Sequence, residues 1–377
     1  MIRLYHVKQT MRVALVHDYL DQFGGQERVL LNLIEMFPEA PIYTLLYEPR
    51  SLGHLLDGKE IHTSFANKSF IRKRHRFFIP ILGHAAESLD LGDKYDLIIT
   101  NTMGFVKGVK YKNGIHISYI HSPLRYAWEP WTYLPDLFPR PLIWAGMPAI
   151  QYVRFQDKRF SQKPDYLLAN SNHIARKIKN FYNREATVIN PPIEDHVFYY
   201  DPKMKKRDYF LIYGRIIHYK KFPMVIRAFK KMGLPLKVIG TGPEENVVKK
   251  LINETDECEY ISFVEDENLL REIISGARAS IVPQVEDFGL VTVESIACGT
   301  PVIGYNAGGT AEIIQDGING ILFNEQTEDS IVNAVRRFEK MAFDPAQVAK
   351  TAERFSKDNF KKQFKTLVAE AVKSAHN

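Results

Sequence analysis

Residues 286–294 read EDFGLVTVE, and they join the apolar run ARASIVPQ at 277–284 to the small-residue stretch SIACGTPVIGYNAGGTAEII at 295–314. This order predicts a buried strand, a sharp turn, a helix that ends at a glycine, another strand, and a helix that begins at a Gly-Gly pair. Strands that alternate with helices in this way are typical of parallel sheets covered on both faces. The segment therefore predicts an α/β fold.

The same alternation extends through the rest of the chain. A proline-rich break lies at 189–198. Apolar, strand-like runs are predicted before it at 12–17, 96–100, 115–120 and 166–170, and after it at 209–214 and 236–240. Helical patterns are predicted at 26–37, 222–232 and 243–255, and an amphipathic helix at 356–375. At 377 residues the chain is too long for one ordinary core. We therefore expect two successive doubly wound α/β halves with a boundary near 190–205.

Composition is that of an ordinary globular protein, with 45% hydrophobic and 25% charged residues. No apolar run is long enough to cross a bilayer, and MIRLYHVKQT at the start has no signal-peptide pattern. The first strand is expected to start at Met11, so residues 1–10 are either a short extension or the product of a misplaced start codon. Cys258 and Cys298 give neither a disulfide framework nor a metal-ligand spacing. We expect buried free thiols in a protein of the reducing cytoplasm.

Positive charge is concentrated in the first half of the chain. Residues 1–190 hold 25 Lys and Arg against 17 Asp and Glu, although the whole chain carries only +6. The densest cluster lies in 68–84, where aromatic residues separate the basic residues Lys68, Arg72, Lys73, Arg74 and Arg76. This pattern suits peripheral binding to an anionic membrane surface, at the inner face of the cytoplasmic membrane. A solvated basic loop is the alternative, and no nucleic-acid motif accompanies the cluster.

The turn at 286–294 has the features of an anion site. A turn that leads into a helix leaves N–H groups facing outward, which suits a phosphate. Glu286 stands at the turn and Glu294 about one helical turn later, so one carboxylate can reach a sugar beyond the phosphates and the other a ribose. On its own, this spacing favours a strand followed by an ordinary amphipathic helix with two surface acids.

Three further stretches suggest ligand binding, and each also has a structural explanation. GRIIHYKK at 214–221 follows a predicted strand and brings Arg215 and Lys220, which could grip a diphosphate or belong to a basic loop. Gly24 and Gly25 open a helix, where they could approach a ligand or form a turn that needs positive φ. VIGTGPE at 238–244 contains Gly240 and Gly242 but lacks the third glycine of a dinucleotide fingerprint.

Together these stretches resemble the family-4 retaining glycosyltransferases, from Met11 almost to the end of the chain. That family has an E-G-F-G-L turn, a second Glu and A-C-G-T-P-V, preceded by G-R-x-x-x-x-K; here Asp287 and Lys221 stand where glycine is usual. The resemblance implies the GT-B fold, in which two Rossmann-like domains face each other across a cleft and a C-terminal helix crosses back to the first domain. The expected limits are 1–195 for the acceptor-side domain, 196–355 for the nucleotide-sugar-binding domain and 356–377 for the helix.

The resemblance also implies roles for individual residues. Glu286 would bind the hydroxyls of the transferred sugar, Glu294 the ribose, and Arg215 with Lys220 the diphosphate. His121, at the end of a predicted strand, would lie near the 6-hydroxyl of the sugar, although a single histidine is more often structural. The remaining donor-binding positions would be Gly24, Gly25, Gly240, Gly242, Phe288, Gly289 and Leu290. Because the chain has no Asp-x-Asp pair and no histidine cluster, we expect neither a metal nor another cofactor.

A narrower resemblance concerns HSPLRYAW at 121–128, which is similar to mannosyltransferases that build surface glycans. Arg125, Tyr126 and Trp128 could instead pack a loop. The resulting prediction is a retaining transferase that moves mannose from GDP-mannose to a lipid-linked or oligosaccharide acceptor. The alternatives are a UDP-sugar-dependent enzyme of the same family, a nucleotide-sugar 2-epimerase of related fold, and a non-catalytic sugar-binding scaffold. A basic membrane- or nucleic-acid-binding protein is a further alternative, which would leave these site residues unexplained.

Overall fold

A computed structural model describes residues 11–72, 78–135 and 137–375. The chain divides into two compact units. The first comprises the described residues up to Pro192 together with those from Phe360 onward, and the second runs from Ile193 to Asn359. The sequence places the corresponding limits at 195 and 355. Each unit is a parallel α/β sheet of the Rossmann type, so the predicted fold class is confirmed.

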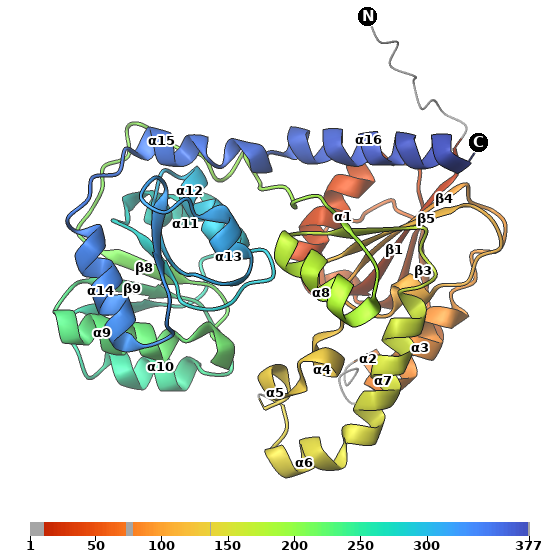
Figure 1. The fold of residues 1–377 in the computed structure, drawn as a ribbon, viewed down its shortest axis with the longest axis horizontal. Helices are drawn as coiled ribbons and strands as arrows, with labels where there is room; N and C mark the ends of the chain where they lie inside the picture. The colour runs from red at the N-terminus through yellow and green to blue at the C-terminus, as the bar shows by residue number, and fades with distance from the viewer. Residues whose placement is uncertain (1–10, 73–77, 136, 376–377) are drawn as a thin grey trace, which may run out of the picture. The chain divides into compact units, whose positions relative to one another are not determined.

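The first unit is built on a seven-stranded parallel sheet with the order β3-β2-β1-β4-β5-β6-β7 (Figure 1). The strand order reverses between β1 and β4, where open sheets of this kind bind ligands beyond the carboxyl ends of their strands. The strands are β1 Val13–Leu20, β2 Ile42–Tyr47, β3 Ile61–Thr63, β4 Leu97–Thr102, β5 Ile115–Ile120, β6 Tyr166–Ala169 and β7 Thr187–Val188.

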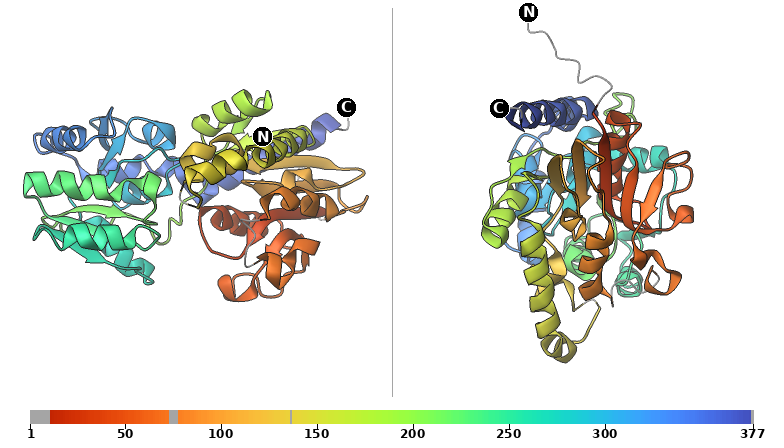
Figure 2. Two further views of the ribbon diagram at one scale, coloured as in Figure 1. Left: turned by 90° about the horizontal axis from the view of Figure 1, so that it is seen from below. Right: turned by 90° about the vertical axis from the view of Figure 1, so that its right-hand side faces the viewer.

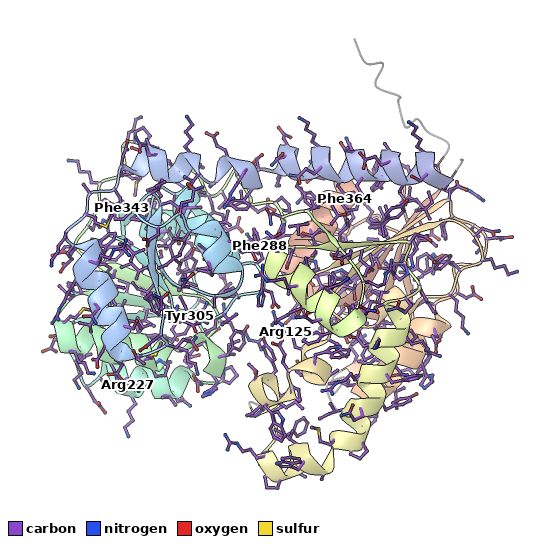
Figure 3. The ribbon with its side chains drawn as sticks, in the orientation of Figure 1. Arg125, Arg227, Phe288, Tyr305, Phe343 and Phe364 are labelled. Carbon is purple, nitrogen blue, oxygen red and sulfur yellow. The ribbon has the colours of Figure 1, made fainter. Side chains whose placement is uncertain are left out.

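Helices connect these strands and close both faces of the sheet. They are α1 Gly25–Met36, α2 Ser69–Arg72, α3 Ile79–Ser88, α4 Arg125–Trp128, α5 Pro130–Tyr133, α6 Arg140–Ala145, α7 Met147–Phe160 and α8 Asn172–Tyr182, with 3₁₀ turns η1 Pro49–Ser51, η2 Phe65–Asn67 and η4 Val106–Gly108. The last helix, α16 Lys357–Ala375, adds its apolar face to the core of this unit. Phe360, Phe364 and Val368 are spaced at four-residue intervals along that face, as the sequence pattern indicates. Phe364 is labelled in Figure 3.

The second unit has a six-stranded parallel sheet with the order β10-β9-β8-β11-β12-β13. Its strands are β8 Phe210–Tyr213, β9 Leu236–Ile239, β10 Cys258–Ile261, β11 Ser280–Val282, β12 Val302–Tyr305 and β13 Gly320–Phe323. Its helices are α9 Phe222–Met232, α10 Glu245–Ile252, α11 Glu267–Gly276, α12 Leu290–Ala297, α13 Gly308–Ile313, α14 Glu328–Phe338 and α15 Pro345–Lys350, with η5 His218–Lys220 and η6 Glu353–Phe355.

Apolar cores fill both faces of the second sheet, and Figure 2 shows this unit from two further directions. Phe210, Phe229 and Val335 belong to the core on the α9 and α14 side, whereas Leu211 and Val293 belong to the core on the α12 side. The two faces alternate along β8 because successive side chains of a strand point in opposite directions. The loops beyond β8, β9 and β11 carry most of the predicted donor-binding residues.

Candidate active site

The predicted donor turn lies between β11 and α12 of the second unit. α12 begins at Leu290 after Gly289, whose φ of +106° is a conformation that glycine adopts most readily. A glycine loop packs against the turn: a Cβ on Gly309 would come within 2.1 Å of Phe288 O, and Gly309 N donates to Glu286 O at 2.7 Å. These contacts fix the backbone from which the Glu286 side chain projects.

The structure brings two of the predicted catalytic side chains into direct contact. Lys220, the last residue of η5, places Nζ 3.2 Å from Oε1 of Glu286. The same carboxylate oxygen accepts a hydrogen bond from Gln284 Nε2 at 2.6 Å. Arg215 is exposed and makes no ion pair or hydrogen bond within the described part of the chain. The loops after β8 and β11 thus assemble a carboxylate with one bound cation and a second cation on the loop that carries Lys220.

Gly240 and Gly242 lie against the loop after β8. A Cβ on Gly240 would come within 1.9 Å of Gly214 O, and one on Gly242 within 2.2 Å of Ile216 O. Ile216 N also donates to Thr241 O at 2.8 Å. These two glycines therefore allow the β8 and β9 loops to pack backbone against backbone, a structural role that the sequence pattern alone does not reveal.

Glu294 is buried on α12, beside the end of β8. Tyr213 donates its hydroxyl to Val291 O at 3.0 Å, and this hydroxyl lies 3.4 Å from Oε2 of Glu294. Burial, and next the charge of Glu294, raises the pKa of Tyr213 well above its usual value. The tyrosine therefore remains a hydrogen-bond donor throughout the physiological pH range.

The aromatic ring of the donor turn serves the core. Phe288, labelled in Figure 3, is buried and packs edge-on against Phe355, with ring centroids 5.6 Å apart. Its side chain anchors the turn to the core on the α12 side. The predicted contribution of this residue to ligand binding is consequently limited to its backbone.

The structure explains both departures from the usual family pattern. Lys221 has a φ of 56°, in the left-handed region, which accounts for the glycine that is usual there. Asp287, in contrast, is not among the described residues that have positive φ, so the backbone at this position does not require glycine. Of the two substitutions, only the one at Lys221 strains the backbone.

In the first unit, Gly24 precedes α1 with φ −163°, an extended conformation open to any residue. Gly25, the first residue of the helix, is also absent from the glycines with positive φ among the described residues. The explanation of this pair as a turn that needs positive φ is therefore wrong. A Cβ on Gly24 would lie 3.3 Å from Oε2 of Glu27, so the glycine leaves room for that carboxylate.

A row of buried polar side chains runs from α1 across the ends of β1, β4 and β5. Oε1 of Glu27 lies 3.1 Å from His17 Nε2, and His17 Nδ1 lies 3.1 Å from Asn101 Nδ2. Asn101 Oδ1 is 2.6 Å from Nε2 of His121. His121, predicted from the sequence, is thus buried at the end of β5. Sequence reasoning missed its three partners, whose one signal is a polar residue near the end of an apolar strand or in the following helix.

The residues of HSPLRYAW at 121–128 have different roles: His121 belongs to the polar row, whereas others make packing contacts. Trp128 donates Nε1–H to Asp157 Oδ2 at 2.7 Å and stacks on Phe181, with ring centroids 4.7 Å apart. Trp128 therefore packs the α4–α7–α8 region, as the structural alternative holds. The guanidinium of Arg125, labelled in Figure 3, lies over the Tyr133 ring at 5.0 Å.

Cys258 and Cys298 are free and buried, as predicted. Burial raises their pKa values, that of Cys258 to about 11 and that of Cys298 to about 12, so both remain unreactive thiols. Within the described ranges, no three His, Cys, Asp or Glu side chains are grouped so that they could hold a metal ion. That the reaction needs no metal stays a prediction. No helix of the described chain has the length and apolar character to span a membrane.

Comparison with known proteins adds two family matches, one in each unit. Residues 201–362 match the family described as "Glycosyl transferases group 1", and residues 23–197 match "Glycosyltransferase Family 4". An uncharacterized glycosyltransferase of Methanocaldococcus jannaschii is 27% identical over 184 residues, which cover 47% of this chain and 50% of that protein. The match to this curated relative thus spans half of its length.

Solved structures resemble nearly the whole chain. Sucrose-phosphate synthase from Thermosynechococcus elongatus has a TM-score of 0.72 at 18% identity, over 97% of this chain and 100% of that chain. Anabaena HepE in complex with UDP has a TM-score of 0.68 at 17% identity, over 96% and 100%. At these identities the likeness establishes the fold, which is that of the GT-B glycosyltransferases. The family matches, together with the fold, support a glycosyltransferase of the family-4 type.

Proposed function

We propose that this protein is a retaining glycosyltransferase that moves a hexose from a nucleotide sugar to a carbohydrate acceptor. The contact between Lys220 and Glu286 is the observation that carries the proposal. These residues follow β8 and β11, which are neighbours at the point where the strand order of the second sheet reverses. Open α/β sheets bind their ligands at that point, and nucleotides in particular.

Charge develops on the leaving nucleoside diphosphate as its bond to the sugar breaks, so a catalyst must place positive charge there. Arg215 and Lys220 supply two cations on one loop. Glu286 binds hydroxyls of the transferred sugar, whose ring passes through an oxocarbenium-like state. The diphosphate itself removes the proton of the incoming acceptor hydroxyl on the face that it leaves. This front-face course retains the anomeric configuration without a separate general base.

The remaining assignments concern binding. Glu294 accepts hydrogen bonds from the ribose hydroxyls, and the backbone of Phe288, Gly289 and Leu290 supports the phosphates and the sugar. Gly24 and Gly25 contribute N–H groups at the start of α1. His121 is assigned to a hydroxyl of the transferred sugar. Each role rests on the family resemblance and agrees with the positions of these residues at the ends of strands or the starts of helices.

GDP-mannose is the proposed donor, and a lipid-linked or growing oligosaccharide of a surface glycan is the proposed acceptor. The resemblance of HSPLRYAW to mannosyltransferases supports the mannosyl donor. A UDP-sugar is the second candidate, because the structurally similar HepE was crystallised with UDP. The two donors differ in base and sugar, so parallel measurements with both distinguish the candidates.

A lipid-linked acceptor requires access to a membrane surface, and we propose peripheral binding at the inner face of the cytoplasmic membrane. Lys73, Arg74 and Arg76 of the cluster at 68–84 lie outside the described residues. Phe70 is exposed, but Arg72 pairs with Glu48 at 2.8 Å. Part of the cluster therefore stabilises the first unit rather than facing a partner.

A second exposed surface of the first unit supports membrane binding more directly. We define the aromatic surface as Trp131, Leu142, Trp144 and Phe155, which are 43%, 58%, 67% and 64% exposed on α5, α6 and α7. The rings of Trp131 and Trp144 lie 5.1 Å apart, and the exposed Arg140 and Lys158 belong to the same helices. Of these four side chains, the two tryptophans contact each other. Exposed apolar side chains on neighbouring helices suit an interaction site, and tryptophan near basic residues suits the interface of an anionic bilayer.

Release of nucleoside diphosphate tests the proposed function. Purified protein is incubated with GDP-mannose or UDP-glucose and a lipid-linked oligosaccharide extract, with and without EDTA. Release of the diphosphate together with transfer of the sugar supports an enzyme, and full activity in EDTA supports charge neutralisation by Arg215 and Lys220. Donor binding without turnover would instead indicate a sugar-binding scaffold. Interconversion of the free nucleotide sugar would indicate an epimerase.

A further inference from the structure

The hydrogen bonds around Asn101 determine the proton positions on two histidines of the first unit. Asn101 Nδ2 lies 2.9 Å from the backbone oxygen of Gln26, which can only accept. This contact orients the amide, because the reverse orientation would place two acceptors together. Asn101 Oδ1 therefore faces His121 Nε2 at 2.6 Å, and this nitrogen must carry the proton that the oxygen accepts.

The amide nitrogen of Asn101 determines the tautomer of the second histidine, His17. Asn101 Nδ2 donates to His17 Nδ1 at 3.1 Å, so His17 Nδ1 carries the lone pair and His17 Nε2 the proton. That proton points to Oε1 of Glu27 at 3.1 Å. Each group from His121 to Glu27 thus donates to the next, and the row ends on a carboxylate. Hydrogen bonds that run in one direction polarise one another, more strongly where water is excluded.

Burial and backbone contacts hold this row in place. His17 and Asn101 are fully buried, and Glu27 and His121 nearly so. His121 N donates to Thr102 O at 2.8 Å, and His121 O accepts from Asn170 Nδ2 at 3.0 Å. The backbone of His121 is therefore fixed to β4, and Nε2 of its imidazole is fixed by Asn101.

We propose that Glu27, His17 and Asn101 are positioning residues that fix the Nε2–H tautomer of His121 and make its Nδ1 the acceptor for a sugar hydroxyl. This inference rests on the proposed function for the role of His121 but not for the tautomer. In the neutral ring the lone pair of Nδ1 can accept an O–H hydrogen bond, whereas the opposite tautomer would present an N–H there. Glu27 at the far end increases the electron density of the row.

The tautomer is measured directly on the full chain labelled with ¹⁵N-histidine, because the ¹⁵N shifts of protonated and unprotonated ring nitrogens differ widely. The His121→Gln variant assigns the signals. At a pH where the ring is neutral, we expect the proton of His121 on Nε2. In Asn101→Leu, which offers no acceptor, a mixture of tautomers is expected. A wild-type ring protonated on Nδ1, or an unchanged ring in Asn101→Leu, would overturn the inference.

Kinetics test whether the row matters for the reaction. Asn101→Leu and Glu27→Ala should each lower kcat about 10-fold or more, the usual effect of losing a group that orients a functional histidine. Glu27→Gln keeps an acceptor for His17 Nε2–H, so it should retain the tautomer and most of the activity. Affinity for free nucleoside diphosphate, whose charged and ribose contacts we assign to Arg215, Lys220 and Glu294 of the second unit, should change much less than kcat in every variant. Equal activity of Glu27→Ala and Glu27→Gln would contradict a positioning role.

His116→Gln is the matched control, because His116 is a buried histidine of β5 outside the row. It should leave the His121 signals and kcat unchanged. A similar loss of kcat in this variant would show that the row contributes only to folding. Should Asn101→Leu fail to fold, the comparison of Glu27→Gln with Glu27→Ala decides the same question. Should every donor fail to react, the proposed function falls, while the NMR measurement still decides the tautomer.

Discussion

Nζ of Lys220 lies 3.2 Å from Oε1 of Glu286, so a cation assigned to the diphosphate and a carboxylate assigned to the sugar contact each other directly. Both side chains are largely withdrawn from solvent, and Gln284 also binds the carboxylate. A charge pair in such a position orders both groups before the donor arrives. The two residues should therefore act as one unit in catalysis.

Removing either member of this pair should lower kcat strongly. We expect Lys220→Ala and Glu286→Ala each to reduce it by roughly 100-fold, the scale of one preorganised contact to the transition state. The double variant should lose much less than the product of the two effects, because coupled residues are not additive. Steady-state kinetics of the three variants measure this.

The exposed pair of Lys230 and Glu254, 3.8 Å apart in the second unit, provides the control. Its alanine variants should leave kcat unchanged, since exposed ion pairs contribute little. Fully multiplicative losses at Lys220 and Glu286 would show that their contact has no catalytic consequence. Arg215→Ala should lower kcat on the same scale as Lys220→Ala.

The two glutamates of the donor turn should separate binding from turnover. Glu294→Gln removes a charged acceptor from the ribose, whose contacts are the same in ground and transition states, so the Kd for nucleoside diphosphate should rise about 10-fold with little change in kcat. Glu286→Gln should instead lower kcat and leave the Kd for nucleoside diphosphate nearly unchanged. Calorimetric titration of both variants with free nucleoside diphosphate tests the division, and equal losses of affinity would refute it.

Lys221→Gly should stabilise the second unit. Lys221 has φ 56°, and a residue with a Cβ is strained there by about 1–2 kcal/mol. Glycine removes the strain but has greater freedom in the unfolded chain, which offsets part of the gain. We expect the free energy of unfolding to rise by about 0.5–1 kcal/mol in urea denaturation. Lys231→Gly, inside α9, should destabilise by a similar amount, and a loss of stability in Lys221→Gly would contradict the argument.

His116 should make the stability of the first unit sensitive to acid. Its burial is the main cause that lowers its pKa from 6.5 to about 3, with smaller effects from Lys163 and Arg184. Between these pH values the unfolded chain binds a proton that the folded chain does not, so the stability supplied by neutral His116 is complete above pH 6.5 and falls as the pH drops towards 3. The Tm of His116→Gln should therefore fall less than that of the wild type between pH 7 and pH 4. A His54→Gln variant, altered at an exposed histidine, should follow the wild type.

The aromatic surface should determine binding to anionic vesicles. A variant with Trp144→Ser and Phe155→Ser should no longer sediment with vesicles of phosphatidylglycerol and phosphatidylethanolamine, because two large apolar side chains no longer enter the interface. Phe263→Ser, which changes an equally exposed aromatic residue of the second unit, should sediment as the wild type does. Unchanged sedimentation of the double variant would leave the cluster at 68–84 as the candidate.

Local sequence pattern predicted the elements whose apolar residues are continuous or strictly periodic. The strand at 115–120 and the helix at 222–232 have the expected bounds, whereas β2, β3 and β7 were missed, and β10 and β13 were expected only as parts of further βα units without bounds. β7 is two residues long and β3 three, too short for a periodic signal. β2, IYTLLY, in contrast, has the apolar pattern of an ordinary strand.

The site was predicted where its residues follow one another in the chain and missed where they meet only through the sheet. Glu286, Glu294, Arg215 and Lys220 stand in recognisable stretches next to single strands. Glu27, His17 and Asn101, in contrast, come from α1, β1 and β4, and they meet only because β1 and β4 are neighbours. The spacing of residues along the sequence does not indicate that β1 and β4 are neighbours in the sheet.

The configuration of the transferred sugar tests the central claim most directly. The protein is supplied with an α-linked nucleotide sugar, GDP-mannose first and UDP-glucose in parallel, and the anomeric coupling of the product is measured by NMR. The account predicts an α-linked product and release of the nucleoside diphosphate. An α-linked product from UDP-glucose alone would replace only the mannosyl donor. A β-linked product from either donor would mean inversion and would contradict the assignment to the retaining glycosyltransferases.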